Sequence, residues 1–188
     1  MERLRYVALG DSYTIGTSVR EEERWPNQLV ANLGVNGFTS RDLIEVELPR
    51  LESLRPEFVS VLIGVNDVVQ GVPAATYRAN VADILDEVVG LVGASRILVV
   101  TTPDYTVTPS GADYGDPAQQ AAGIREHNAI ITTAAEVRGI AVVDIHDISL
   151  EAATDRNLVA SDGLHPSGPQ YARWVKLIAP AVGSLLAG

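Results

Sequence analysis

Short apolar runs alternate with longer segments of helical spacing along this chain, and that alternation constrains the fold more than any other feature. The apolar runs are rich in Val and Ile, as strands buried on both faces are, and they comprise Tyr6–Leu9, Phe58–Ile63, Ile97–Thr101 and Ile140–Ile145. The intervening segments predict helices over Trp25–Asn32, Ser40–Leu51, Ala74–Val92, Pro117–Arg138 and Pro169–Leu186. Strands that alternate with helices form a parallel sheet covered on both faces.

A fifth, shorter strand is expected at Leu33–Asn36. We therefore predict a flavodoxin-like three-layer α/β/α sandwich, with a five-stranded parallel sheet in the order 2-1-3-4-5. No repeat, low-complexity tract or linker interrupts the sequence, which predicts a single domain over residues 1–188. The longest irregular stretch, Thr102–Asp116, is a candidate wall for a binding site at the edge of the sheet.

Composition narrows the classes of partner and chemistry. The net charge is −10, from 24 acidic and 14 basic residues, and Lys176 is the sole lysine. Such a chain repels phosphate backbones and anionic membranes, so we expect neither a nucleic-acid partner nor stable membrane association. The sequence has no cysteine, which excludes disulfides and thiolate chemistry. It shows neither a basic-then-apolar leader nor an apolar run of membrane-spanning length, which favours a cytoplasmic location.

Polar residues follow the expected strands where ligands collect in such a sheet, beyond the carboxyl ends of the strands. Ser12 follows the first strand in Gly10-Asp11-Ser12-Tyr13, and Gly37 follows the second. Asn66 comes after the third strand, whereas Asp162 and His165 lie three residues apart before the last helix. We expect all of these groups to meet at one edge of the sheet.

Their chemical types are those that acyl transfer requires. A serine hydroxyl becomes a good nucleophile beside a histidine whose other ring nitrogen is held by a carboxylate. The spacing lets Asp162 reach the His165 imidazole from the same loop, so Ser12, His165 and Asp162 are the candidate catalytic residues. Negative charge on the ester oxygen needs donors already aimed at it, and the backbone N–H groups of Ser12 and Gly37 with the Asn66 amide are the candidates.

The same residues carry a resemblance to a known family. The blocks Gly10-Asp11-Ser12-Tyr13-Thr14, Asn36-Gly37, Gly64-Val65-Asn66-Asp67 and Asp162-Gly163-Leu164-His165-Pro166 resemble, in order, those of the SGNH (GDSL-type) hydrolases. The resemblance spans residues 10 to 166. It implies Ser12 as nucleophile, His165 as base and Asp162 as its partner. It also implies an oxyanion hole of Ser12, Gly37 and Asn66, and no metal or organic cofactor. Position 14 is threonine, so the Gly-x-Ser-x-Gly pentapeptide of α/β-hydrolases is absent.

Several residues have simpler interpretations. Ser12 and Asp11 fit the start of a helix as capping residues, and we expect that role for Asp11. Asp67 is expected to brace its loop through backbone hydrogen bonds. Gly34 is the alternative to Gly37 as an oxyanion donor. Two further histidines fall outside the blocks: we expect His146 at the end of a strand rather than in a metal site, and His127 as a surface or half-buried helix residue.

The sequence thus predicts a serine esterase that forms an acyl-enzyme on Ser12. Short acyl or acetyl esters of small molecules or sugars are the expected substrates, with Tyr105, Val107 and Tyr114 as candidate substrate-binding residues. Lysophospholipase or thioesterase activity is an alternative within the same family. From another class, a non-catalytic flavodoxin-like ligand-binding module is the competing hypothesis, although it leaves Ser12 and His165 unexplained. Neither phosphate-loop motif, Gly-x-x-x-x-Gly-Lys or Gly-x-Gly-x-x-Gly, occurs.

Overall fold

The computed structural model describes residues 4–25 and 31–187. Within them, five parallel strands form one sheet in the order β2-β1-β3-β4-β5, as the sequence predicts. The strands are β1 (Tyr6–Gly10), β2 (Ala31–Asn32), β3 (Phe58–Leu62), β4 (Ile97–Val100) and β5 (Ala141–Val143). Four of them begin within one residue of the predicted position. Of these, β1, β3 and β4 are buried on both faces and are therefore rich in apolar residues.

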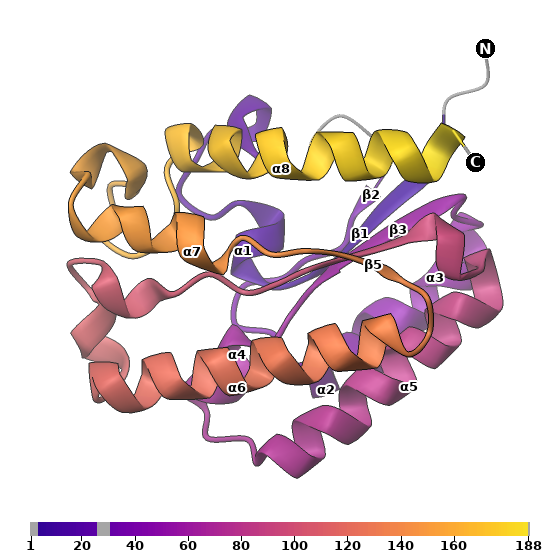
Figure 1. The fold of residues 1–188 in the computed structure, drawn as a ribbon, viewed down its shortest axis with the longest axis horizontal. Helices are drawn as coiled ribbons and strands as arrows, with labels where there is room; N and C mark the ends of the chain where they lie inside the picture. Colours follow the sequence, from indigo (N-terminus) through magenta and orange to yellow (C-terminus); the bar gives the residue numbers. More distant parts are fainter. Residues whose placement is uncertain (1–3, 26–30, 188) are drawn as a thin grey trace.

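Helices cover both faces of this sheet, and Figure 1 shows the resulting layers with α8 on one side and α3, α5 and α6 on the other. The α-helices are α1 (Ser12–Ile15), α2 (Ser40–Asp42), α3 (Leu48–Leu54), α4 (Val65–Val69), α5 (Ala74–Val92), α6 (Pro117–Glu136), α7 (His146–Ser149) and α8 (Gly168–Ala187). A π-helical turn, Leu43–Glu47, joins α2 to α3. Short 3-10 turns lie at Glu21–Glu23, Ala94–Arg96, Tyr105–Val107, Gly111–Tyr114, Leu150–Ala153 and Arg156–Leu158.

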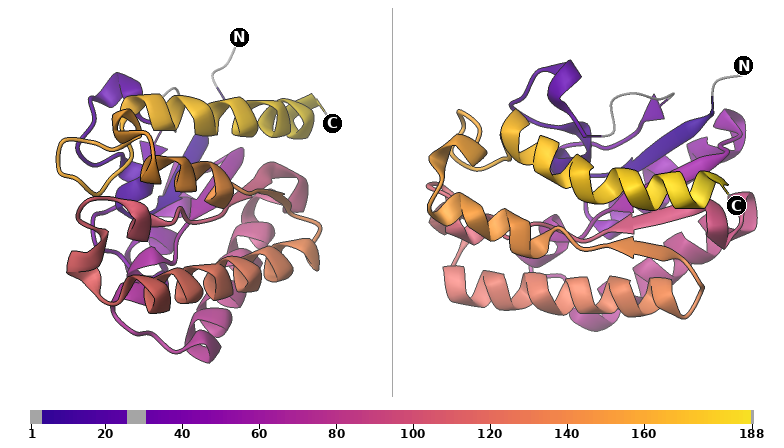
Figure 2. Two further views of the ribbon diagram at one scale, coloured as in Figure 1. Left: turned by 60° about the vertical axis from the view of Figure 1, so that its left-hand side comes forward. Right: turned by 45° about the horizontal axis from the view of Figure 1, so that its top comes forward.

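Two apolar clusters fill the spaces between the layers. Along β1 the side chains alternate between them: Val7 and Leu9 pack with α3 and α5, whereas Tyr6 and Ala8 pack with α8. This is the period of two expected of a strand between two helical layers. Trp174 and Tyr171 of α8, both fully buried, anchor the second cluster. The two views of Figure 2 show α8 crossing one face of the sheet over its whole length.

The second strand corrects the sequence-based expectation. The sequence predicts a helix over Trp25–Asn32, but Ala31 and Asn32 form β2, which pairs with Val7 and Ala8 of β1. Residues 26–30 of that predicted helix lie outside the described residues. The predicted strand Leu33–Asn36 follows β2 directly, and its first residues still pair with β1 through Leu33 N–H to Ala8 O at 2.9 Å and Val35 N–H to Gly10 O at 3.1 Å.

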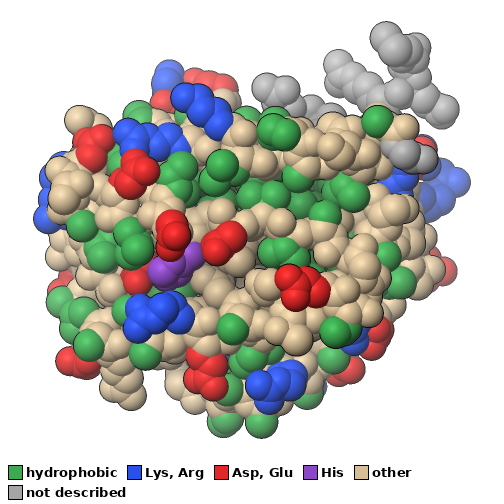
Figure 3. Space-filling model, in the orientation of Figure 1, with side chains coloured by type: hydrophobic (Ala, Val, Ile, Leu, Met, Phe, Trp, Pro, Cys, Tyr) green, Lys and Arg blue, Asp and Glu red, His purple; other side chains and the backbone are tan. Residues whose placement is uncertain are grey.

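Charge is dispersed over the surface shown in Figure 3, where acidic and basic side chains are interspersed and hydrophobic side chains gather along and below α8. No helix among the described residues is long and apolar enough to cross a bilayer.

Candidate active site

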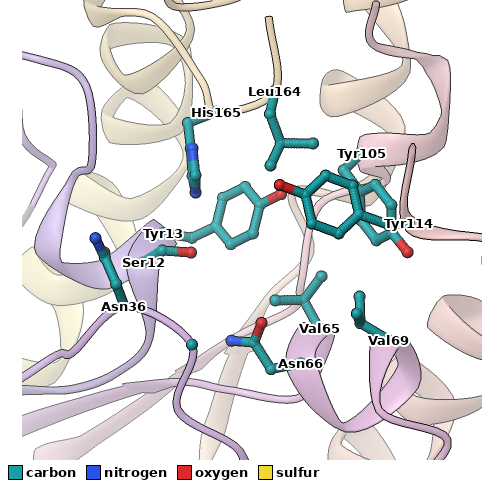
Figure 4. Close-up of a pocket in the computed structure, with 11 residues that line it drawn as sticks. Ser12, Tyr13, Asn36, Val65, Asn66, Val69, Tyr105, Tyr114, Leu164 and His165 are labelled. Carbon is teal, nitrogen blue, oxygen red and sulfur yellow. The ribbon is translucent and has the colours of Figure 1, made fainter. Parts of the chain in front are cut away.

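A cavity of about 200 Å³ opens at the carboxyl edge of the sheet, where the loops after β1, β2 and β3 meet the loop before α8 (Figure 4). Six of the residues singled out from the sequence line it, together with apolar neighbours. The lining comprises Ser12, Tyr13, Asn36, Gly37, Val65, Asn66, Val69, Tyr105, Tyr114, Leu164 and His165. Residues more than 150 positions apart in the chain therefore share one small cavity.

Ser12 is held at the cavity by a tight turn from β1 into α1. Gly10 has a φ of 146°, and a Cβ atom there would lie 2.0 Å from the Leu62 carbonyl oxygen, so only glycine lets β1 turn this close to β3. Asp11 then caps α1 by accepting the Tyr13 N–H at 3.0 Å. The capping role expected of Asp11 is confirmed, and Ser12 becomes the first residue of the helix.

A buried carboxyl group that no sequence pattern singles out lies beneath this turn. Glu47, the last residue of the π-helical turn, accepts the Gly10 N–H at 3.0 Å through Oε2. Burial raises the pKa of Glu47 to about 9, and burial also raises the pKa of Asp11 to about 8. Asp11 Oδ2 and Glu47 Oε1 have no hydrogen-bond partner in the protein. Both carboxyls are thus favoured in the protonated form at neutral pH.

Asp162 and His165 form a hydrogen-bonded pair within one loop. The distance from Asp162 Oδ2 to His165 Nδ1 is 2.7 Å, and Asp162 Oδ1 accepts the N–H groups of Leu164 at 2.9 Å and of His165 at 3.0 Å. The loop closes on itself through Ala160 N–H to His165 O at 2.7 Å. Since the carboxylate occupies Nδ1, the remaining nitrogen, Nε2, is free for chemistry, and in Figure 4 it points toward the Ser12 hydroxyl.

The Asp162 carboxylate is favoured in its ionised form. Burial acts to raise its pKa, but hydrogen bonds outweigh burial and lower the pKa to about 2, with the bond from the Ser18 hydroxyl as the largest contributor. Ser18 Oγ lies 2.5 Å from Asp162 Oδ2. Sequence reasoning did not identify Ser18, because nothing near it in the chain indicates a contact with a residue 144 positions away.

Gly37 and Asn66 follow β2 and β3, the two strands that flank β1, and they line another side of the cavity. Gly37 has a φ of 82°, and a Cβ atom built on it would meet nothing within 4 Å, so its backbone is open to a ligand. The Asn66 amide donates to Phe38 O at 2.9 Å, which fixes its orientation. Gly34, the alternative donor, does not line the cavity, and a Cβ atom there would lie 2.9 Å from the Asp11 carbonyl oxygen. The geometry favours Gly37.

Two tyrosines form the outer part of the cavity, as expected from the stretch Thr102–Asp116. Tyr105 is buried and donates its hydroxyl to Gln120 Oε1 at 2.8 Å, and its ring meets that of Tyr114 edge-on with 5.9 Å between centroids. Tyr114 is exposed at the mouth. Val107, the third residue expected here, does not line the cavity.

The other two histidines differ in detail from expectation. His127 is buried rather than half-buried or at the surface: it stacks on Tyr77 with 4.1 Å between ring centroids, and its Nδ1 lies 3.4 Å from the carbonyl oxygen of Gly64. His146 starts α7 instead of ending a strand, and its Nε2 lies 3.8 Å from Asp104 Oδ2. No group of three potential metal ligands occurs anywhere in residues 4–25 and 31–187.

Comparisons with known proteins identify a family model that matches the chain. The model of the GDSL-like lipase/acylhydrolase family matches residues 8–173. A comparison with curated proteins finds no significant relative by sequence.

Similar solved structures share the fold at low sequence identity. An acetylxylan esterase from Geobacillus stearothermophilus superimposes with a TM-score of 0.74 at 20% identity, covering 96% of this chain and 94% of that one. A lipase/acylhydrolase from Enterococcus faecalis gives a TM-score of 0.72 at 20% identity, with 95% of each chain covered. A member of the lipolytic G-D-S-L family from Veillonella parvula gives 0.75 at 15% identity, over 94% of this chain and 97% of that one. With the family model matching most of its length, the chain belongs to the GDSL-like lipase/acylhydrolase family.

Proposed function

We propose that the protein is a serine esterase that hydrolyses short acyl esters through an acyl-enzyme on Ser12. The observation that carries the proposal is the 2.7 Å contact between Asp162 Oδ2 and His165 Nδ1, in a loop whose imidazole lines the same cavity as Ser12. A carboxylate on Nδ1 fixes the tautomer that leaves Nε2 able to accept a proton.

The reaction has two half-reactions. Ser12 Oγ attacks the acyl carbon while His165 Nε2 takes the hydroxyl proton, and the tetrahedral intermediate then expels the alcohol, to which His165 returns the proton. Water repeats the sequence on the acyl-enzyme and releases the acid. Asp162 stays ionised throughout and stabilises the imidazolium form of His165, a role that suits a carboxyl whose pKa is about 2.

Negative charge on the tetrahedral oxygen is stabilised by the N–H groups of Ser12 and Gly37 and by the Asn66 amide. The open backbone at Gly37 and the amide fixed against Phe38 O support this assignment. Donors held in place before the reaction cost no reorganisation as the charge develops, which is why such groups accelerate acyl transfer.

The size of the cavity favours a small acyl group. A volume of about 200 Å³ shared by Val65, Val69 and Leu164 suits an acetyl or similarly short chain rather than a long lipid chain. The structural similarity to an acetylxylan esterase is consistent with acetyl esters, including those of sugars. Tyr114 at the open mouth would contact the alcohol portion of the substrate.

A fluorophosphonate probe tests the nucleophile directly, because such probes label an activated serine. Labelling of the wild type at Ser12, confirmed by peptide mass spectrometry and lost in Ser12→Ala, is the expected result. Unlabelled wild-type protein would favour the non-catalytic binding module.

Ester hydrolysis should also depend on Ser12. Ser12→Ala should reduce ester hydrolysis by up to about 10⁶-fold with an unchanged circular dichroism spectrum. A series of nitrophenyl esters from acetate to palmitate, run beside acyl thioesters, then separates the activities. A maximum at short acyl esters supports the proposal, whereas preference for palmitate or for thioesters supports the lysophospholipase or thioesterase alternative.

A further inference from the structure

Ser18 occupies a backbone conformation that a serine adopts only at a steric cost. Its φ is 65°, in the left-handed region that favours glycine. Among the described residues only Arg55 shares this property without being glycine, and Arg55 terminates helix α3. Ser18 lies instead in the loop after α1 and ends no helix, so its strain calls for another explanation.

The contact made by the Ser18 side chain explains this backbone conformation. Its hydroxyl donates to Asp162 Oδ2 at 2.5 Å, and that oxygen is the one that accepts from His165 Nδ1 at 2.7 Å. With the two backbone N–H donors on Oδ1, the carboxylate has four hydrogen bonds, of which only the Ser18 bond comes from outside the loop that carries Asp162. It is a direct side-chain connection between the segment of the nucleophile and the segment of the base.

The neighbouring residue makes a parallel contact with a different partner. The Thr17 hydroxyl donates to Asn36 Oδ1, next to Gly37 on the loop after β2. Thus two adjacent hydroxyls from one loop reach two sides of the cavity. The contact of Thr17 involves no titrating group, which makes it a matched comparison for Ser18.

We propose that Ser18 is a positioning residue for the Asp162–His165 pair: its hydroxyl fixes the carboxylate and limits the negative charge that Oδ2 presents to the imidazole. The proposal rests on the proposed esterase function, since it assigns to His165 the role of the base. Water can hydrate the oxygen once the hydroxyl is removed, but water does not hold the carboxylate in one orientation.

Few other titratable groups face this pair. The ring of Tyr13, from α1, lies 5.3 Å from that of His165, and Tyr171, from α8, also interacts electrostatically with Asp162. Burial raises the pKa of both tyrosines, so both are neutral across the pH range of ester hydrolysis. Asp11, buried beside Ser12, has a pKa raised to about 8 and keeps its proton through the acid limb of the pH–rate profile. A change in that limb therefore reports on the Asp162–His165 pair.

Substitutions at Ser18 separate the hydroxyl from the backbone strain. Ser18→Gly removes both, Ser18→Ala removes the hydroxyl alone, and Ser18→Thr keeps the hydroxyl but places a β-branched residue in the left-handed region. Thermal stability should rank Gly at or above wild type, with Ala no higher than wild type and Thr lowest. Activity should instead depend on whether the residue at position 18 carries a hydroxyl.

We expect kcat to fall about tenfold in Ser18→Gly and Ser18→Ala, with KM within about twofold of wild type. The acid limb of kcat/KM should move to higher pH by roughly half a unit. Without the hydrogen bond from Ser18, the Asp162 carboxylate stabilises the imidazolium form of His165 more strongly. Ser18→Thr should keep the wild-type acid limb, and Thr17→Val should leave the acid limb in place. A stable Ser18→Gly protein with wild-type kcat and acid limb would overturn the proposal, as would an equal shift in Thr17→Val.

A measurement that needs no turnover distinguishes this inference from the proposed function. The chain has three histidines, so the His165 imidazole can be assigned and titrated by NMR in the Ser12→Ala background. Adding Ser18→Gly should raise its titration midpoint, and an unchanged or lowered midpoint contradicts the role of Ser18. If the midpoint rises but the wild type hydrolyses no ester, the esterase proposal fails and the coupling of Ser18 to the pair stands.

Discussion

The Asp67 carboxylate accepts two hydrogen bonds from Ser40, one from its backbone N–H at 2.8 Å and one from its hydroxyl at 2.5 Å. Asp67 follows Asn66 in α4, and Ser40 begins α2 three residues after Gly37. The pair therefore ties together the two loops that carry the proposed oxyanion donors. The expectation that Asp67 braces its loop through backbone hydrogen bonds is confirmed in part, because a side-chain bond contributes as well.

Breaking this tie should weaken catalysis more than binding. In Asp67→Ala we expect kcat to fall by about tenfold or more while KM changes little, because the bond from Asn66 to Phe38 O alone holds Gly37 and Asn66 less firmly at a fixed separation. The buried Ser40 groups also lose their acceptor, so the free energy of unfolding should fall by ~1–3 kcal/mol. Steady-state kinetics and urea unfolding measure the two effects. Ser40→Ala, which removes only the hydroxyl bond, should give an intermediate result, and a variant with normal kcat would contradict the bracing role.

Removing the Asn66 amide tests one donor by itself. Asn66→Ala should lower kcat by roughly 10²–10³ with a small change in KM, because the donor acts on charge that appears only in the transition state. Fluorophosphonate labelling of Ser12 provides the control for an intact nucleophile. A rise in KM at unchanged kcat would assign Asn66 to substrate binding instead.

Glu47 should make stability depend on pH in the direction opposite to an ion-paired carboxylate. Its pKa is about 9 in the folded protein against an ordinary value of 4.5, so the folded state holds a proton that the unfolded state releases. This stabilisation is fully present below about pH 4.5 and is lost as the pH rises through about 9. Glu47→Gln cannot ionise, and its free energy of unfolding relative to wild type should rise between pH 5 and pH 9 by at least ~1 kcal/mol. Chemical denaturation across that range measures the difference.

Asp11 contributes to the same pH dependence, because its pKa of about 8 is also raised by burial. Asp11→Asn should therefore give a smaller version of the Glu47→Gln effect. Glu52→Gln, at an exposed position of α3, serves as the control for the substitution itself. If Glu47→Gln has the same pH dependence as wild type, Glu47 is ionised in the folded protein.

Gly64→Ala should destabilise the protein strongly. Gly64 has a φ of 132°, and a Cβ atom would lie 2.6 Å from the Tyr77 hydroxyl oxygen, which is itself bonded to Ile63 O at 2.9 Å. We expect a loss of ~2–4 kcal/mol in the free energy of unfolding. Gly90→Ala is the matched control, because Gly90 lies inside α5 with open space around it and should gain ~0.5–1 kcal/mol. Thermal denaturation of both variants checks the contrast.

The sequence predicted those parts of the fold in which local pattern and tertiary environment agree. The apolar runs of β1, β3 and β4 are buried on both faces, so residue type alone located them. The edge strand β2 has an Ala-Asn sequence and only half-buried side chains, which removes both the apolar run and the alternation that indicate a strand.

The residues of the site also separate into those that the sequence could predict and those that it could not. Ser12, Gly37, Asn66 and His165 each follow a strand or occupy a short motif, so topology brought them to one cavity. Ser18 and Glu47 could not be found, because their contacts join loops and helices whose relative placement is a tertiary property. Glu47 in particular belongs to Glu45-Val46-Glu47, which has the polarity of a solvent-facing helix turn.

The π-helical turn Leu43–Glu47 is equivalent to an α-helix that has accommodated one additional residue. Deleting one residue of this turn before Glu47 would restore α-helical winding and leave α2 and α3 close to their present register, because the wider turn has already absorbed that residue. Ser40 would then keep its bonds to Asp67, and Glu47 its bond to the Gly10 N–H. The extra residue of the turn should therefore be dispensable, whereas a deletion within α3, which is a regular α-helix, would rotate the flanking residues by about 100°.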